Sequence, residues 1–167
     1  MNIKNKLQEY LDSYLKETSV GRKSIAYGAF YEYEESTTPM YGLRDVNNYI
    51  NDEKEENTFQ TLLFKYIDKR GLKDSDVYNK VNIDRRLFSK IRSDKNYHPS
   101  KETVILLGIS LELNEDEIET LLSSAAYSLP KNNEYDLIIR FCFKEKIYDL
   151  NQINEFLYDY NLKTLNN

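Results

Sequence analysis

The chain has 167 residues, of which 40% are hydrophobic and 31% are charged, with a formal net charge of −5 and an isoelectric point near 5.1. This length suits one compact domain with an additional arm, and the apolar fraction is sufficient for a core. The acidic balance excludes a general nucleic-acid coat protein and a polybasic membrane-binding protein, because both need a positive field over much of their surface.

The N-terminal segment, residues 1–57, predicts an amphipathic helix followed by a tyrosine-rich linker. Apolar residues at positions 3, 7, 11 and 15 recur at helical spacing, so residues 3–17 are expected to form a helix that packs on another element. Glycine and proline interrupt residues 18–57, where we predict a linker with one short helix at residues 43–50. Its tyrosines either lie on the protein's own surface or form a partner-binding segment that orders on binding.

Residues 58–129 are predicted to form a compact bundle of five helices. The helix boundaries follow from a glycine C-cap, a left-handed turn residue and polar N-caps, which are Gly71, Asn82, Asp84, Ser100 and Asn114. In the third helix of this bundle, Phe88 and Ile91 are expected to face the core.

Residues 130–167 are predicted to add a C-terminal helical extension. Residues 135–146 are apolar nearly all round, which suits a buried helix or a central strand, and we favour a helix because no other strand is available for pairing. A final helix follows to about residue 160. The predicted fold class is therefore all-α.

The residue types present argue against catalysis. Cys142 is the only cysteine and lies in an apolar run, where a thiol behaves as a small core residue, so a reducing cytoplasm is the simplest location. His98 is the only histidine and is expected in a loop, which makes a Cys/His pair improbable. The glycines never cluster as a phosphate-binding loop needs. We therefore expect that the chain is not an enzyme, that it binds no metal or cofactor, and that it has no membrane-spanning segment.

Positive charge is concentrated in one segment of the chain. Residues 1–57 carry 7 basic and 11 acidic side chains, and residues 102–167 carry 5 basic and 12 acidic ones. Residues 58–101 carry 11 basic and 5 acidic side chains, a net charge of +6. Within this basic segment, the stretch GLKDSDVYNKVNIDRRLFSKI predicts two short helices separated by a three-residue turn, and the second helix begins with two arginines.

This stretch resembles the Cro/repressor (XRE-like) type of helix-turn-helix, and SDKNYHPSKETVILLGISLEL continues the similarity, which covers residues 58–127. The resemblance implies a lambda-repressor-like bundle of five helices with extra C-terminal helices and an N-terminal helical arm. It also implies that the protein is bacterial, binds DNA and regulates transcription. The wider sequence also resembles a C-terminal accessory region appended to macro domains in some Gram-positive bacteria, with GLRDVNNYI matching part of that upstream region.

The helix-turn-helix resemblance implies that double-stranded DNA is read in the major groove. Arg85, Arg86 and Lys90 occupy the positions that face the bases, where the arginine fork suits the two acceptors of guanine. Ser89 and Arg92 are predicted to lie on the exposed side of the same helix. The other predicted DNA-binding residues, Lys73, Lys95 and Lys101, are expected to approach the phosphates.

Binding to a protein partner is the alternative function. Asp74 stands where the family often has a glutamine that helps to hold the DNA backbone, and a carboxylate repels phosphate. Leu87 is expected on the exposed side, where an apolar residue with a charged rim suits a protein interface. The linker residues Tyr31, Tyr33 and Tyr41 would contribute to the same function. The sequence also leaves open whether the protein forms a homodimer that reads two half-sites.

Overall fold

The computed structural model describes residues 3–20, 45–48 and 58–166, and these residues form helices and connecting turns without a β-strand among them. The predicted all-α bundle is confirmed. Its helices are α1 (Ile3–Val20), α3 (Phe59–Lys69), α4 (Asp74–Lys80), α5 (Arg85–Ser93), α6 (Lys101–Ser110), α7 (Glu115–Ser124), α8 (Glu134–Lys144) and α9 (Leu150–Asp159). Residues 45–48 are also helical. The rest of the helix predicted for residues 43–50 lies outside the described residues.

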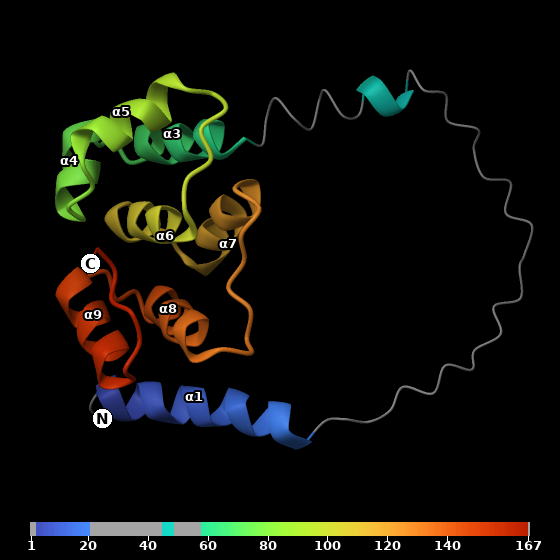
Figure 1. The fold of residues 1–167 in the computed structure, drawn as a ribbon, viewed down its shortest axis with the longest axis vertical. Coiled ribbons are helices and arrows are strands. Elements are labelled where there is room, and N and C mark those ends of the chain that lie inside the picture. The colour runs from blue at the N-terminus through green and yellow to red at the C-terminus, as the bar shows by residue number, and fades with distance from the viewer. Residues whose placement is uncertain (1–2, 21–44, 49–57, 167) are drawn as a thin grey trace, which may run out of the picture.

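The helices are stacked in layers from one end of the molecule to the other (Figure 1). Helices α3, α4 and α5 form one end, α6 and α7 lie below them, α8 and α9 follow, and α1 lies across the opposite end. Helix α6 is the centre of this stack, since every side chain from residue 103 to residue 110 is buried. Helix α5, which carries the residues predicted to face DNA, and α1 are therefore at opposite ends of the protein.

The helix ends predicted within residues 58–129 are confirmed by the hydrogen bonds and backbone angles at their cap residues. Asp84 begins α5 by accepting hydrogen bonds from the backbone nitrogens of Arg86 and Leu87 at 2.6 and 3.4 Å. Gly71 and Asn82 have φ values of 62° and 54°, the left-handed conformation in which glycine and asparagine are favoured. Thr58, Ser100 and Asn114 cap α3, α6 and α7.

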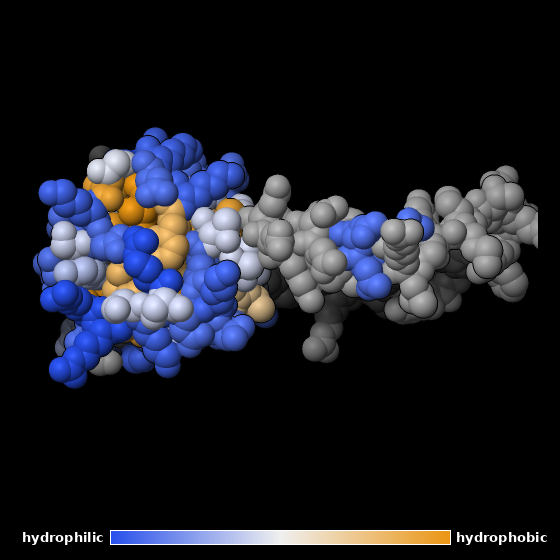
Figure 2. All heavy atoms as spheres, turned by 90° about the horizontal axis from the view of Figure 1, so that it is seen from above, coloured by the Kyte–Doolittle hydropathy of each residue, from blue (hydrophilic) through white to orange (hydrophobic). Residues whose placement is uncertain are grey.

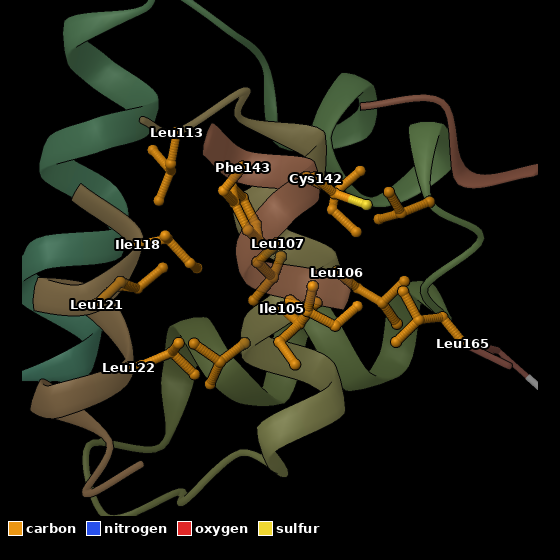
Figure 3. Packing of buried hydrophobic residues seen from close by; sticks show 14 of the residues in the cluster. Ile105, Leu106, Leu107, Leu113, Ile118, Leu121, Leu122, Cys142, Phe143 and Leu165 are labelled. Atoms are coloured by element: carbon orange, nitrogen blue, oxygen red, sulfur yellow. The ribbon is translucent and has the colours of Figure 1, made fainter. Parts of the chain in front are cut away.

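One cluster of buried apolar residues includes members of every layer, and Figure 3 shows its central part around α6, α7 and α8. Around α6, Leu107 lies next to Phe143 of α8, and Leu106 points toward Leu165 of the C-terminal tail. The α7 residues Ile118, Leu121 and Leu122 lie on the opposite side of α6 from Leu165. Gly108 permits this close packing, because a Cβ atom at residue 108 would lie 2.4 Å from Cδ1 of Ile118. The core joins residues from all three segments that the sequence predicts.

Helix α1 finds its packing partner within the same chain. Its apolar residues Leu7 and Leu11 are 2% and 0% exposed, and the ring of Tyr10 lies 5.3 Å from that of Phe141 in α8. The predicted amphipathic helix therefore covers the C-terminal extension rather than the α3–α5 end.

The C-terminal tail reaches back to the connection between α4 and α5. Leu165 is buried at 1% exposure, and the side-chain nitrogen of Asn166 donates to the carbonyl oxygen of Val81. The backbone nitrogen of Asn166 donates to Glu102 at 2.9 Å. The contact with Val81 holds the tail against the turn that precedes α5. No pattern in the sequence predicts this long-range contact.

Candidate nucleic-acid interface

Helices α4 and α5 are fixed against each other and against α3 by buried side chains. Val77 and Val81 are fully buried on the α4 side, and Phe88 and Ile91 are 2% and 0% exposed on the α5 side. The ring of Phe88 lies 5.6 Å from that of Tyr78 and 6.4 Å from that of Phe64. Because the inner face of α5 is fully packed, its orientation is set by the core, and its polar face is turned outward.

The outward face of α5 carries most of the residues predicted to face DNA bases. Arg85, Arg86, Ser89 and Lys90 are all exposed. Neither arginine takes part in an ion pair within the part of the chain that the structure describes. The ammonium group of Lys90 lies 5.0 Å from the ring centroid of Tyr97, which is a cation–π contact that leaves the charge at the surface.

Arg92, the fifth predicted residue on α5, is engaged within the protein. Its guanidinium group donates two hydrogen bonds, of 2.7 and 2.5 Å, to the carboxylate of Asp74 in α4. The same group stacks on Phe64 of α3, with Cζ at 4.1 Å from the ring centroid. Arg92 therefore ties three helices together, and Asp74 does not present an uncompensated charge.

The three lysines predicted to approach phosphates differ in their surroundings. Lys73 precedes α4 and Lys95 follows α5, and both side chains are exposed. Lys101 instead donates a hydrogen bond of 2.5 Å to Asp136 of α8, a carboxylate whose residue is only 3% exposed. The expectation that Lys101 is directed at phosphate therefore needs correction, because its charge compensates a buried acid.

Other basic residues of the 58–101 segment are also in ion pairs away from α5. Lys69 and Arg70 contact Glu117 at 3.2 and 2.6 Å, and Lys80 contacts Glu112 at 2.5 Å. Burial of the Glu117 carboxyl tends to raise its pKa. Hydrogen bonds from the backbone of Asn114 and from the Arg70 and Lys69 side chains have a larger opposite effect, so the pKa of Glu117 is lowered overall. These pairs connect α3 and α4 to the α6–α7 layer.

A shallow groove of about 390 Å³ separates α4 from α5. It is lined by charged and hydroxyl side chains together with the rings of Tyr78 and Phe88. Figure 2, which looks onto this end of the molecule, shows hydrophobic residues surrounded by hydrophilic ones.

Leu87 is half-buried against the core, so the expectation that it is an exposed anchor needs correction.

A larger open groove, of about 810 Å³, lies between the start of α3, the loop after α5 and the end of α7. His98 lies at its edge, with its ring 5.4 Å from that of Tyr127 in an edge-on arrangement. The hydroxyl of Tyr127 donates to the carbonyl oxygen of Pro99 at 3.1 Å. These contacts hold the loop that leads from α5 to α6.

The described residues offer little for nucleophilic or metal chemistry. Cys142 is 1% exposed, and burial raises the pKa of its thiol to about 12, so the reactive thiolate is disfavoured. Within the described ranges, no group of three or more His, Cys, Asp or Glu residues is placed to hold a metal ion. No helix in these ranges has the length and apolar character to cross a membrane. The linker residues Tyr31, Tyr33 and Tyr41 lie outside the residues that the structure describes.

Comparison of the chain with protein-family models, with curated proteins and with solved structures finds no match.

Proposed function

We propose that the chain is a non-enzymatic DNA-binding regulator that inserts α5 into the major groove of a duplex. In this proposal, Arg85 and Arg86 contact the edges of bases, Lys90 extends the contact, and Lys73 and Lys95 contact the phosphates on either side. Arginine pairs with the O6 and N7 acceptors of guanine, so a half-site that contains G·C pairs is expected.

The observation that carries the proposal is the division of the basic residues into two groups. Among residues 58–101, five basic side chains form ion pairs within the described parts of the chain, namely Lys69, Arg70, Lys80, Arg92 and Lys101. The basic side chains without such a pair are Lys65, Lys73, Arg85, Arg86, Lys90 and Lys95. Five of these six belong to α5 or to the residues that border α4 and α5.

This division matters because an unpaired cation breaks no ion pair when it turns toward phosphate, whereas a paired one must first lose its partner. Each phosphate neutralised by lysine or arginine releases condensed counterions from the duplex, and this release drives association. The buried inner face of α5 also fixes the backbone positions from which its arginines project, which favours reading of a defined sequence over loose association.

The direct test is selection from a pool of random duplexes, followed by affinity measurements on the recovered sequence over a range of salt concentrations. Arg85→Ala or Arg86→Ala should weaken binding by roughly 1–3 kcal/mol and relax preference at one base pair. Lys73→Ala or Lys95→Ala should weaken binding to all sequences similarly and reduce the salt slope by about 1.

Lys146→Gln is a suitable control, since Lys146 is an exposed lysine that follows α8, in the layer remote from α5. This variant should bind as the wild type does. The proposal is wrong if the protein binds no duplex at low salt, or if the Arg85 and Arg86 variants behave like the control.

A protein-recognition adaptor or inhibitor is the second candidate, and the half-buried ring of Tyr78 in the otherwise polar α4–α5 groove favours it. Tyr78 would receive an apolar side chain of a partner, while Arg85 and Lys73 would form the charged rim. Tyr78→Ser, which removes a ring from this groove and leaves the charges of α5 unchanged, separates the two functions. Loss of a protein partner with DNA affinity unchanged would favour the adaptor.

A further inference from the structure

Helix α5 ends differently from the other helices between residues 58 and 166. Each of the others is followed by a residue in the left-handed conformation, with φ between 51° and 62°. These residues are Gly71, Asn82, Glu112, Ala126, Lys146 and Asn161. Such a residue turns the backbone so that the amides after a helix can bond to its last carbonyl oxygens. After α5 the chain instead becomes extended at Asp94, with φ of −106° and ψ of 101°.

The C-terminal end of α5 is closed by a side chain of another helix. The side-chain nitrogen of Gln60, in the first turn of α3, donates to the carbonyl oxygens of Ile91 and Asp94, each at 2.5 Å. The Ile91 carbonyl accepts no backbone hydrogen bond within the described part of the chain. A primary amide suits this place because one nitrogen carries two hydrogens. Gln60 therefore takes the place of the left-handed turn that α5 lacks.

The contacts of Gln60 continue to Lys90 on the outward face of α5. The Asp94 carbonyl that accepts from Gln60 also accepts from the backbone nitrogen of Tyr97 at 3.0 Å, which closes the turn after α5. The ring of Tyr97 in turn lies 5.0 Å from the Lys90 ammonium group. The Lys90 carbonyl accepts from the backbone nitrogen of Asp94 at 3.0 Å. Both the backbone and the side chain of Lys90 are thus held by the turn that Gln60 closes.

The surroundings of Gln60 favour an effect on orientation over an effect on folding. Gln60 is half-buried and borders the open groove of about 810 Å³ between α3, the loop after α5 and α7. Water can reach the two carbonyl groups from this groove if the amide is removed, so they would not be left without partners. Phe88 and Ile91 would still anchor the inner face of α5 in the core. Loss of Gln60 should therefore loosen the end of α5 without unfolding the bundle.

We propose that Gln60 is a positioning residue, which holds the C-terminal end of α5 from α3 and thereby fixes Lys90 for contact with the duplex. This role rests on the proposed function, in which Lys90 extends the contact of α5 with DNA. Removal of the amide leaves every cation of the DNA-binding face in the chain but lets the end of α5 move. Recognition of a defined sequence is then lost, while attraction to phosphate is kept.

Gln60→Ala should lower the preference for the selected duplex over a random duplex by roughly tenfold, because two hydrogen bonds to α5 are lost. Affinity for the random duplex and its salt slope should equal those of the wild type. In a Lys90→Ala chain, Gln60→Ala should have little further effect on preference. The matched control is Gln152→Ala, which removes a half-buried glutamine of α9, in a layer remote from α5, and should leave the preference unchanged.

Hydrogen exchange measures the same role without nucleic acid. In Gln60→Ala, the backbone amides of Asp94 and Tyr97 should exchange roughly tenfold faster, whereas those in the centre of α6 should exchange as in the wild type. A residue that only stabilises the whole fold would speed exchange in α6 as well. Gln60→Lys should restore slow exchange at Asp94 and Tyr97, because an ammonium group also donates to the carbonyl oxygens at a helix end.

The outcomes separate this role from the proposed function. Unchanged exchange at Asp94 and Tyr97 in Gln60→Ala, or faster exchange in α6 to the same degree, would overturn the positioning role. An unchanged preference for the selected duplex would do so too, and in each of these cases the proposed DNA binding would stand. A wild-type chain that binds no duplex at low salt would overturn both.

Discussion

The carboxylate of Asp74 accepts two hydrogen bonds from the guanidinium group of Arg92, which also stacks on Phe64. This pair reconciles two features of the sequence that point in opposite directions. An acidic residue at the start of α4 argues against a nearby phosphate, and a fourth cation on α5 argues for one. Paired with each other, they contribute almost no net charge to the proposed DNA-binding face.

Asp74→Asn should therefore strengthen DNA binding if the proposed function holds. Without the carboxylate, the Arg92 guanidinium becomes available to phosphate, so we expect an affinity gain of roughly 1 kcal/mol and a salt slope steeper by about 1. The cost in stability should be below about 1 kcal/mol, because the Arg92 and Asp74 side chains remain 52% and 35% exposed. Fluorescence anisotropy over a salt series and urea unfolding would measure both effects.

Asp68→Asn is the matched control for this prediction, because it removes one negative charge from an exposed position of α3. It should leave the salt slope unchanged. Equal slopes for wild type and Asp74→Asn would show that Arg92 does not reach the duplex.

Lys101→Met should reduce stability without changing the salt dependence of DNA binding. The substitution leaves the buried carboxylate of Asp136 without its cation, although Asn133 still donates to it at 2.7 Å. Removal of one partner from a fully buried pair costs about 3–5 kcal/mol, and roughly 1–3 kcal/mol is expected here because Lys101 is partly exposed. Urea unfolding measures the loss.

Adding Asp136→Asn to Lys101→Met removes the unpaired charge and should restore part of the free energy of unfolding. A reduced salt slope in Lys101→Met with unchanged stability would instead assign Lys101 to phosphate contact, as the sequence alone suggested.

Local signals in the sequence predicted the helices well, whereas the partners of individual charges were not predictable. Asp84 and Asn114 lie at the helix starts assigned to them, because a cap depends on residues within one turn of the same helix. The Lys101–Asp136 pair spans 35 residues, and the contact of Asn166 with Val81 spans 85. Such contacts depend on how layers pack, and a single sequence carries no pattern that reports them.

Gly108→Ala should destabilise the protein through a steric clash rather than through backbone strain. The added Cβ would lie 2.4 Å from Cδ1 of Ile118 and 3.1 Å from Cζ of Phe143, in the fully packed centre of the core. Overpacking of this kind costs roughly 1–3 kcal/mol. Ile118→Val removes the nearest atom, so the double variant should lose less free energy of unfolding than the sum of the single variants.

Gly71→Ala provides the contrast for Gly108→Ala. Its φ of +62° strains any side chain, but no atom lies within 4 Å of an added Cβ. A cost of roughly 1 kcal/mol is expected, and Ile118→Val should not relieve it. Additive effects for Gly108→Ala and Ile118→Val would show that the two side chains do not compete for the same space.

The stability of the protein should fall in alkaline solution, and Cys142 should account for the start of this fall. Burial raises the pKa of the thiol from 9.0 to about 12 in the folded protein. Above pH 9 the unfolded chain loses this proton while the folded chain keeps it, so the unfolded state binds fewer protons and the free energy of unfolding decreases up to about pH 12. The slope from this group is at most about 1.4 kcal/mol per pH unit.

Cys142→Ala should flatten the decline between pH 9 and 10, as measured by urea unfolding at a series of pH values, even though the variant is less stable throughout because of the cavity it creates. Tyr10 and Tyr135 would still contribute above pH 10, since burial raises the pKa of each hydroxyl from 10.0 to about 12. The comparison therefore concerns slopes rather than absolute stabilities. If wild type and Cys142→Ala lose stability at the same rate between pH 9 and 10, the thiol is not held in its neutral form by the core.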